Sequence, residues 1–137
     1  MKTRQAVSLI SCCVVAAGLV ISACARQQPP LDGSDIAGAY TLVSVNGNPV
    51  PTSVDHQGAA LQVRSGTLTL GADGTCSTRT VFVPPSGTEV RREVGATYTR
   101  DGSRLTLRWK GAGKTTGTIA DGTFTMDNEG MVFVYRK

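Results

Sequence analysis

The stretch WKGAGKTTG, residues 109–117, contains side chains that bind phosphate in many nucleotide-binding proteins. Residues 113–115 are a glycine, a lysine and a threonine, in the order in which a phosphate-binding loop ends. Such a loop needs another glycine five positions earlier, where this chain has Arg108, and it must lead into a helix. Residues 115–119 are instead typical of a strand. We therefore predict a flexible hairpin loop here and no nucleotide ligand.

A second candidate for chemistry is the pair Asp55 and His56, which contains the only histidine of the sequence. The pair lies in the polar segment 53–58, and no serine or cysteine nucleophile has a sequence setting that couples to it. No cluster of histidine, cysteine and acidic residues has the spacing of a metal site. We expect His56 to be a solvated loop residue, and we predict no enzymatic activity, no metal and no cofactor.

The N-terminal segment has the composition of an export signal. Lys2 and Arg4 give a basic start, and residues 6–23 follow without a charged side chain. A transmembrane anchor is the alternative interpretation, because about 20 apolar residues span a bilayer. Small residues immediately before a cysteine, followed by a polar chain, favour processing over a membrane span.

The end of this segment, ISAC at residues 21–24, resembles the lipobox of bacterial lipoproteins. The resemblance implies a signal peptide over 1–23, lipid modification of Cys24, for example with palmitate, and attachment to a membrane. The polar residues 24–35 would then form the lipidated N-terminus and a flexible tether. Ala25 in place of aspartate implies the outer membrane, facing the periplasm, if the host is Gram-negative. The expected location is therefore the cell envelope.

Export also changes how charge and cysteines are interpreted. Loss of Lys2 and Arg4 lowers the formal charge from +4 to +2, so the basic composition indicates no nucleic-acid partner. Cys76 becomes the one cysteine of the processed domain, since the other three lie at or before position 24. It falls in an alternating strand, which predicts a buried thiol.

From residue 36 onward the pattern is β throughout, because apolar residues recur with period two and turn dipeptides come at short intervals. Adjacent short strands joined by tight turns predict an all-β antiparallel meander, which closes into a small barrel of about eight strands. The expected strands are residues 38–45, 60–70, 75–83, 88–100, 103–110, 115–120, 123–126 and 131–136.

Turn chemistry also predicts strand registers. A two-residue turn at Asp101-Gly102 sets Tyr98 opposite Leu105, and it sets Glu93 opposite Lys110. A parity switch in the second long strand predicts a bulge around Ser65-Gly66.

Two later hairpins follow the same logic. A turn at Asp121-Gly122 sets Ile119 opposite Phe124. A four-residue loop over 127–130 sets Phe124 opposite Phe133. These registers place apolar side chains on one inner face.

Four stretches resemble the small bacterial lipocalin-like domains: GAY at 38–40, TLVSVNGNPVP at 41–51, GTLTLGADGT at 66–75 and MVFVYRK at 131–137. The resemblance covers 36–137 and implies one lipocalin-like barrel domain. It also implies a small apolar or lipid ligand inside the barrel. True lipocalins carry Gly-x-Trp in the first strand, where this chain has a tyrosine.

Two sets of residues are candidate binding sites. The expected inner face could line a ligand cavity or simply fill a core. The outer face of one strand, with Arg91 and Arg92 nearby, could bind an anionic headgroup or an acidic partner, or be solvated. The inner set is Tyr40, Tyr98, Leu107, Trp109, Phe124, Phe133 and Tyr135, and the outer set is Arg104, Arg108 and Lys110.

The favoured function is a membrane-anchored lipoprotein that binds a small apolar or lipid molecule in the envelope. The alternatives are a protein-interaction or inhibitor module of the envelope, and a structural lipoprotein without a specific ligand.

Overall fold

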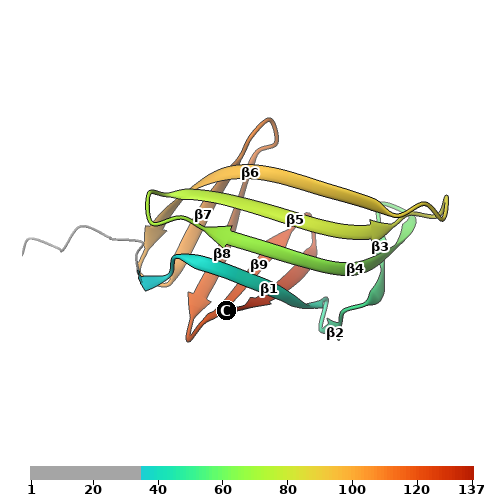
Figure 1. Cartoon of the computed structure of the whole chain (residues 1–137), viewed down its shortest axis with the longest axis horizontal. Helices are drawn as coiled ribbons and strands as arrows, with labels where there is room; N and C mark the ends of the chain where they lie inside the picture. The colour runs from blue at the N-terminus through green and yellow to red at the C-terminus, as the bar shows by residue number, and fades with distance from the viewer. Residues whose placement is uncertain (1–34) are drawn as a thin grey trace, which may run out of the picture.

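The computed structural model describes residues 35–137, and the predicted signal peptide, Cys24 and most of the tether lie outside this range. The described chain is all β (Figure 1). Its ten strands are β1 (Gly38–Val45), β2 (Asn48–Pro49), β3 (Thr52–His56), β4 (Ala59–Leu70), β5 (Thr75–Val83), β6 (Val90–Asp101), β7 (Arg104–Trp109), β8 (Lys114–Ala120), β9 (Thr123–Asn128) and β10 (Met131–Arg136).

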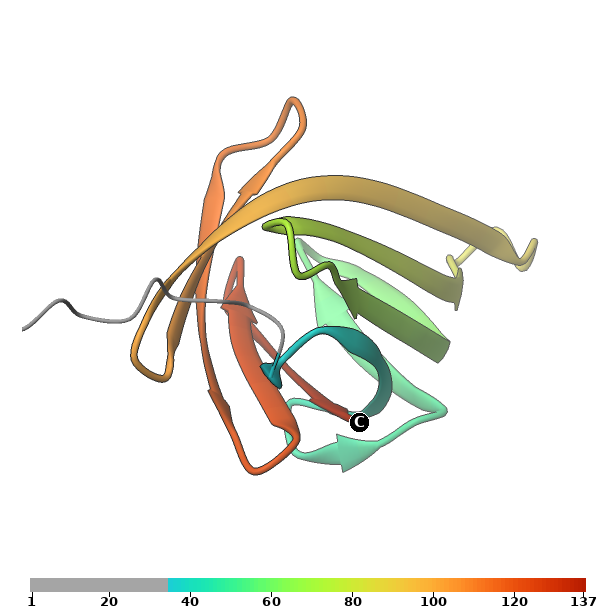
Figure 2. The same cartoon turned by 60° about the vertical axis from the view of Figure 1, so that its left-hand side comes forward.

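The strands form one antiparallel sheet in the order β2-β1-β10-β9-β8-β7-β6-β5-β4-β3. A further pairing of β1 with β4 closes a ring of eight strands, with β2 and β3 outside it. The closed ring and the strand that curls back to complete it can be followed in Figure 2. The predicted antiparallel barrel of about eight strands is therefore confirmed. Closure leaves no unpaired edge along the ring itself.

The eight strands expected from the sequence all exist, but β2 and β3 were missed. Each borders a tight turn: β2 follows Asn46-Gly47, and β3 precedes Gln57-Gly58, and all four turn residues have positive φ. This is the backbone of the type I′ hairpin. In β3 only Val54 is buried, so its alternation is too weak to distinguish it from a polar loop.

Two predicted registers are wrong by two residues. The β6–β7 turn is Gly102-Ser103, with φ 59° at Gly102, so Tyr98 pairs with Leu107 rather than Leu105. Glycine at the first central position suits a type II′ hairpin. As a result, the predicted partner of Glu93, Lys110, lies beside Gly95. A shift of two keeps every side chain on its predicted face.

The β9–β10 loop is also shorter than expected. It has two residues, Glu129-Gly130, both with positive φ, so Phe133 pairs with Met126 and not with Phe124. The Asp121-Gly122 turn and the pairing of Ile119 with Phe124 are confirmed. So is the bulge in β4, which interrupts the pairing with β5 between Val63 and Ser65.

The core lies inside the barrel and is one connected cluster drawn from residues 36–135. Its largest fully buried side chains are Tyr40, Tyr135, Phe124, Leu68, Leu70, Leu105, Leu107 and Val45. Ring closure and core both lie within 35–137. Within it, no helix has the length and apolar character needed to cross a membrane.

Candidate ligand cavity

One end of the barrel contains a cavity of about 260 Å³. Its wall is formed by β3, the start of β4, the end of β5, the start of β6, the ends of β7 and β9, and by β10 from its first residue. Most of the lining is apolar, including Val63, Phe82, Val94, Met126 and Met131. A concave, mostly apolar pocket with a few polar groups is the usual form of a small-molecule site.

The predicted inner-face residues divide between the two ends of the barrel. Trp109, Phe133 and Tyr135 line the cavity. The other four are buried in the core without lining it: Tyr40, Tyr98, Leu107 and Phe124. Alternation places all seven inside but does not determine where the interior is left open. As ligand-binding residues, the first three stay predictions.

A contact between two polar side chains lies in the cavity wall. His56 Nε2 lies 3.3 Å from Glu129 Oε2, and both side chains line the cavity. The contact joins the β3–β4 turn to the β9–β10 turn. The expectation of a solvated loop residue at His56 is wrong, because the residue ends β3 and its side chain is only 22% exposed.

A chain of hydrogen bonds fixes the tryptophan in the wall. Trp109 Nε1 donates to Thr115 Oγ1 at 2.8 Å, and the Thr115 hydroxyl donates to Asn128 Oδ1 at 3.0 Å. Thr115 is buried, whereas Trp109 and Asn128 both line the cavity. The indole N–H is thus satisfied, so its ring presents an apolar surface to a ligand.

The cavity also contains a cation that the sequence analysis assigned to the outer surface. Arg92 lines the cavity, in the same alternating set of β6 as Val94, Ala96 and Tyr98. Its neighbour Arg91 must therefore point outward. The alternation of β6 predicts these opposite orientations, since adjacent residues in a strand lie on opposite faces.

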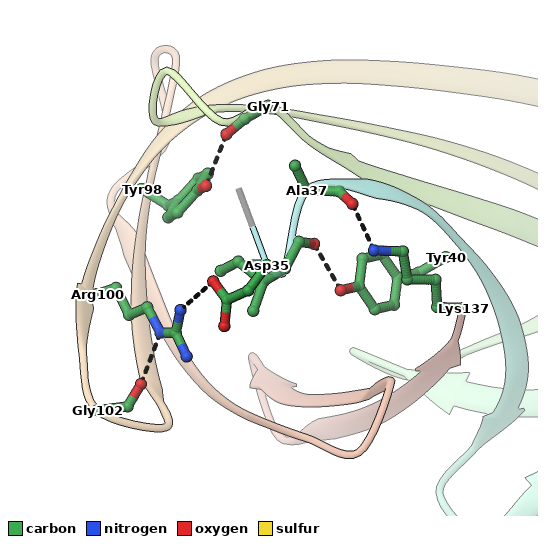
Figure 3. Close-up of polar contacts among 9 residues, drawn as sticks. Asp35, Ala37, Tyr40, Gly71, Tyr98, Arg100, Gly102 and Lys137 are labelled. Carbon is green, nitrogen blue, oxygen red and sulfur yellow. Dashed lines mark hydrogen bonds and ion pairs between the residues drawn. The ribbon is translucent and has the colours of Figure 1, made fainter. Parts of the chain in front are cut away.

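The opposite end of the barrel is closed by Asp35 and Ile36, which precede β1 (Figure 3). Ile36 is buried, and its carbonyl accepts a 2.6 Å hydrogen bond from the Tyr40 hydroxyl. Arg100 holds Asp35 at 2.6 Å, although Asp35 was expected to belong to the tether. Tyr98 closes the same end by donating to the Gly71 carbonyl at 2.6 Å.

Hydrogen bonding and burial shift the pKa values of several side chains. The hydrogen bond from Arg100 lowers the pKa of Asp35, although this side chain is exposed. Burial raises the pKa values of Tyr40 and Tyr98, and raises that of Tyr135 strongly. These hydroxyls therefore remain donors at neutral pH.

The single thiol of the domain lies toward the closed end. Cys76 is buried, as predicted, and pairs with Leu70 across β4 and β5. Desolvation raises its pKa from 9.0 to about 11. A thiol with so little thiolate is a packing residue at neutral pH.

The outer basic residues stay predictions as a partner surface. Arg104, Arg108 and Lys110 are exposed. Lys114 joins them, because it pairs with Arg108 across β7 and β8. The loop before Lys114 is the predicted hairpin, with positive φ at Gly111 and Gly113. Among residues 35–137, no group of histidine, cysteine and acidic side chains is arranged to hold a metal ion.

No protein-family model and no curated protein matches this chain. Three solved structures match this chain. A lipocalin-like protein from Bacteroides uniformis is 17% identical, with a TM-score of 0.45, over 75% of this chain and 98% of that one. Two mutants of the fluorescent protein UnaG are each 13% identical, over 76% of this chain and 96% of theirs, with TM-scores of 0.37 and 0.35.

Proposed function

We propose that this protein is an envelope lipoprotein that binds a small, largely apolar molecule in the open end of its barrel, and that it acts as a binding protein rather than an enzyme. The cavity of about 260 Å³, bounded by apolar side chains and by Trp109, is the observation that supports this function. At roughly 30 Å³ for each non-hydrogen atom, it accommodates about nine such atoms. A longer molecule would extend through the mouth.

Burial of apolar surface would provide the affinity. Each buried methylene contributes about 0.8 kcal/mol. A chain of several carbons in contact with Val63, Phe82 and Phe133 would therefore offset the cost of losing its freedom in solution.

The experiment is native mass spectrometry of residues 25–137, exported to the periplasm and purified gently. A bound mass of a few hundred daltons, lost on denaturation, is the expected result. Val94→Phe, which fills the cavity, should abolish it, whereas the control Val132→Phe places the same ring on an exposed position of β10 and should retain it. A bare mass for the unaltered protein, unchanged after addition of medium-chain lipids, would exclude the function.

We also propose that Cys24 carries the lipid that attaches the protein to the membrane, in the outer membrane of a Gram-negative host. Asp35 lies at the closed end, so the tether would leave from the end opposite the cavity. Palmitate labelling of the full chain and of Cys24→Ser tests the anchor. Labelling and membrane attachment should disappear in the variant, and their persistence would contradict lipidation at this residue.

The outer basic face favours a second function, as a protein-interaction module. Arg104, Arg108, Lys110 and Lys114 form a cationic surface on β7 and β8. None of the four makes an ion pair within the described part of the chain. Changing the first three to glutamate should remove an acidic partner without changing occupancy of the cavity. Equal recovery of partners by the altered protein would exclude this role.

A further inference from the structure

One cation of the cavity wall has no acidic partner. The lining contains one arginine, Arg92, and one acidic residue, Glu129. His56 and Glu129 face each other at 3.3 Å. Arg92 has no carboxylate within ion-pair distance anywhere in residues 35–137.

The acidic residue nearest to Arg92 in the sequence cannot form an ion pair with it. Glu93 is adjacent in sequence and therefore on the other face of β6. There it contacts Arg79, with Nη2 and Oε2 3.2 Å apart, across the outer surface of β5 and β6. On the inner face, the residue opposite Arg92 is Thr80, which also lines the cavity and carries no charge.

We infer that the ligand is a small anionic amphiphile whose acidic group pairs with Arg92 while its apolar body fills the cavity. This inference rests on the proposed function and defines its ligand class. A guanidinium group offers forked N–H donors that match a carboxylate or a phosphate oxygen pair. A neutral ligand would leave Arg92 solvated without gain, and a cationic ligand would be repelled by it.

The relative positions of Arg92 and the apolar lining determine which kind of ligand would fit. Arg92 is exposed, and Val94, which pairs with Thr78, lies one step deeper on the same inner surface. The acidic group therefore stays partly hydrated while the chain behind it is buried. A linear acid of about eight carbons satisfies both requirements, given space for about nine non-hydrogen atoms.

Octanoate and 1-octanol provide a matched pair of probes, since they share the chain and differ in charge. Each is titrated at neutral pH into residues 25–137, followed by the fluorescence of Trp109, the only tryptophan, and by calorimetry. We expect octanoate to bind about fivefold more tightly, as a partly solvated ion pair worth about 1 kcal/mol would give. Added salt should weaken octanoate binding and spare 1-octanol.

Arg92→Gln removes the charge with little change of length, and Arg91→Gln makes the same change on the outer face. The preference for octanoate should disappear in Arg92→Gln and persist in Arg91→Gln, with both variants melting as the unaltered protein does. Equal affinities for both probes, or equal effects of the two substitutions, would overturn the inference and leave the proposed function intact. Failure of both probes to bind, together with a bare chain in the mass spectrum, would overturn both.

Discussion

The two ends of this barrel are made by the same strands with the same alternation, yet one is packed and the other is hollow. At the closed end Ile36 plugs the interior, held by the Tyr40 hydroxyl. At the open end the interior keeps a cavity of about 260 Å³, with His56 and Glu129 in contact at its wall. The difference indicates that the short segment before β1, rather than the strand pattern, determines where interior volume remains.

The largest effect is expected when one phenylalanine side chain at each end of the barrel is shortened to alanine. Phe124 is fully buried beside the ring of Tyr135, so Phe124→Ala should lower the free energy of unfolding by about 3–5 kcal/mol. Phe82 is half-buried in the cavity wall, and Phe82→Ala should cost about 1 kcal/mol while weakening ligand binding. Urea unfolding of both variants measures the two costs. Equal losses would contradict a packed end and a hollow one.

Thiol reactivity compares the same two ends. The raised pKa of Cys76, about 11, lowers its thiolate fraction about 100-fold at pH 8 relative to an ordinary thiol. Labelling of the folded protein should therefore be at least about 100-fold slower than after unfolding. In a Cys76→Ser background, Val94→Cys should place a thiol in the cavity wall that reacts rapidly. A Cys76 that reacts as fast as this control would show that the packed end opens readily.

Ile36, which plugs the closed end, accepts a hydrogen bond that Tyr40→Phe removes. The Ile36 carbonyl would lose its 2.6 Å donor, at a cost of about 1 kcal/mol. In a domain of this size, the melting temperature should fall by about 4–8 °C. Tyr135→Phe, at a buried side chain in the cavity wall, serves as the comparison. A Tyr40→Phe protein that melts unchanged would show that this hydrogen bond does not hold the plug.

The sequence predicts the parts of this fold that depend on local chemistry. Alternation assigns the faces of Tyr98 and Leu107 correctly, even though the β6–β7 register is two residues from the expected one. The register was misjudged because Asp101-Gly102 and Gly102-Ser103 are both acceptable turns, and only the packing of the barrel chooses between them. The bulge near Ser65 is equally readable, from the change of parity alone.

The candidate site is less predictable because it depends on what lies across the barrel. No local pattern tells that Trp109 and Phe133 border open volume while Phe124 is tightly packed. His56 appeared to be a loop residue because β3 has a single buried side chain. The position of Arg92, in contrast, can be predicted from its spacing to Val94, because residues two apart in a strand lie on the same face.

The smallest effect we expect is the response of the closed end to acid. The hydrogen bond from Arg100 lowers the pKa of Asp35 from 3.8 in the folded protein. A lowered pKa stabilises the fold above the unfolded value, and this contribution is lost as the pH falls through the folded value. The pair is exposed, so the contribution is small and weakened by salt.

Melting temperatures between about pH 5 and pH 3 measure this contribution. The melting temperature should fall over this range, and Asp35→Asn should fall less because it has already lost the contact. Asp55→Asn, an exposed change on β3 near the mouth, should follow the unaltered protein. If Asp35→Asn and Asp55→Asn show the same profile, Arg100 does not hold the plug in place, and Ile36 and Tyr40 alone distinguish the closed end from the open one.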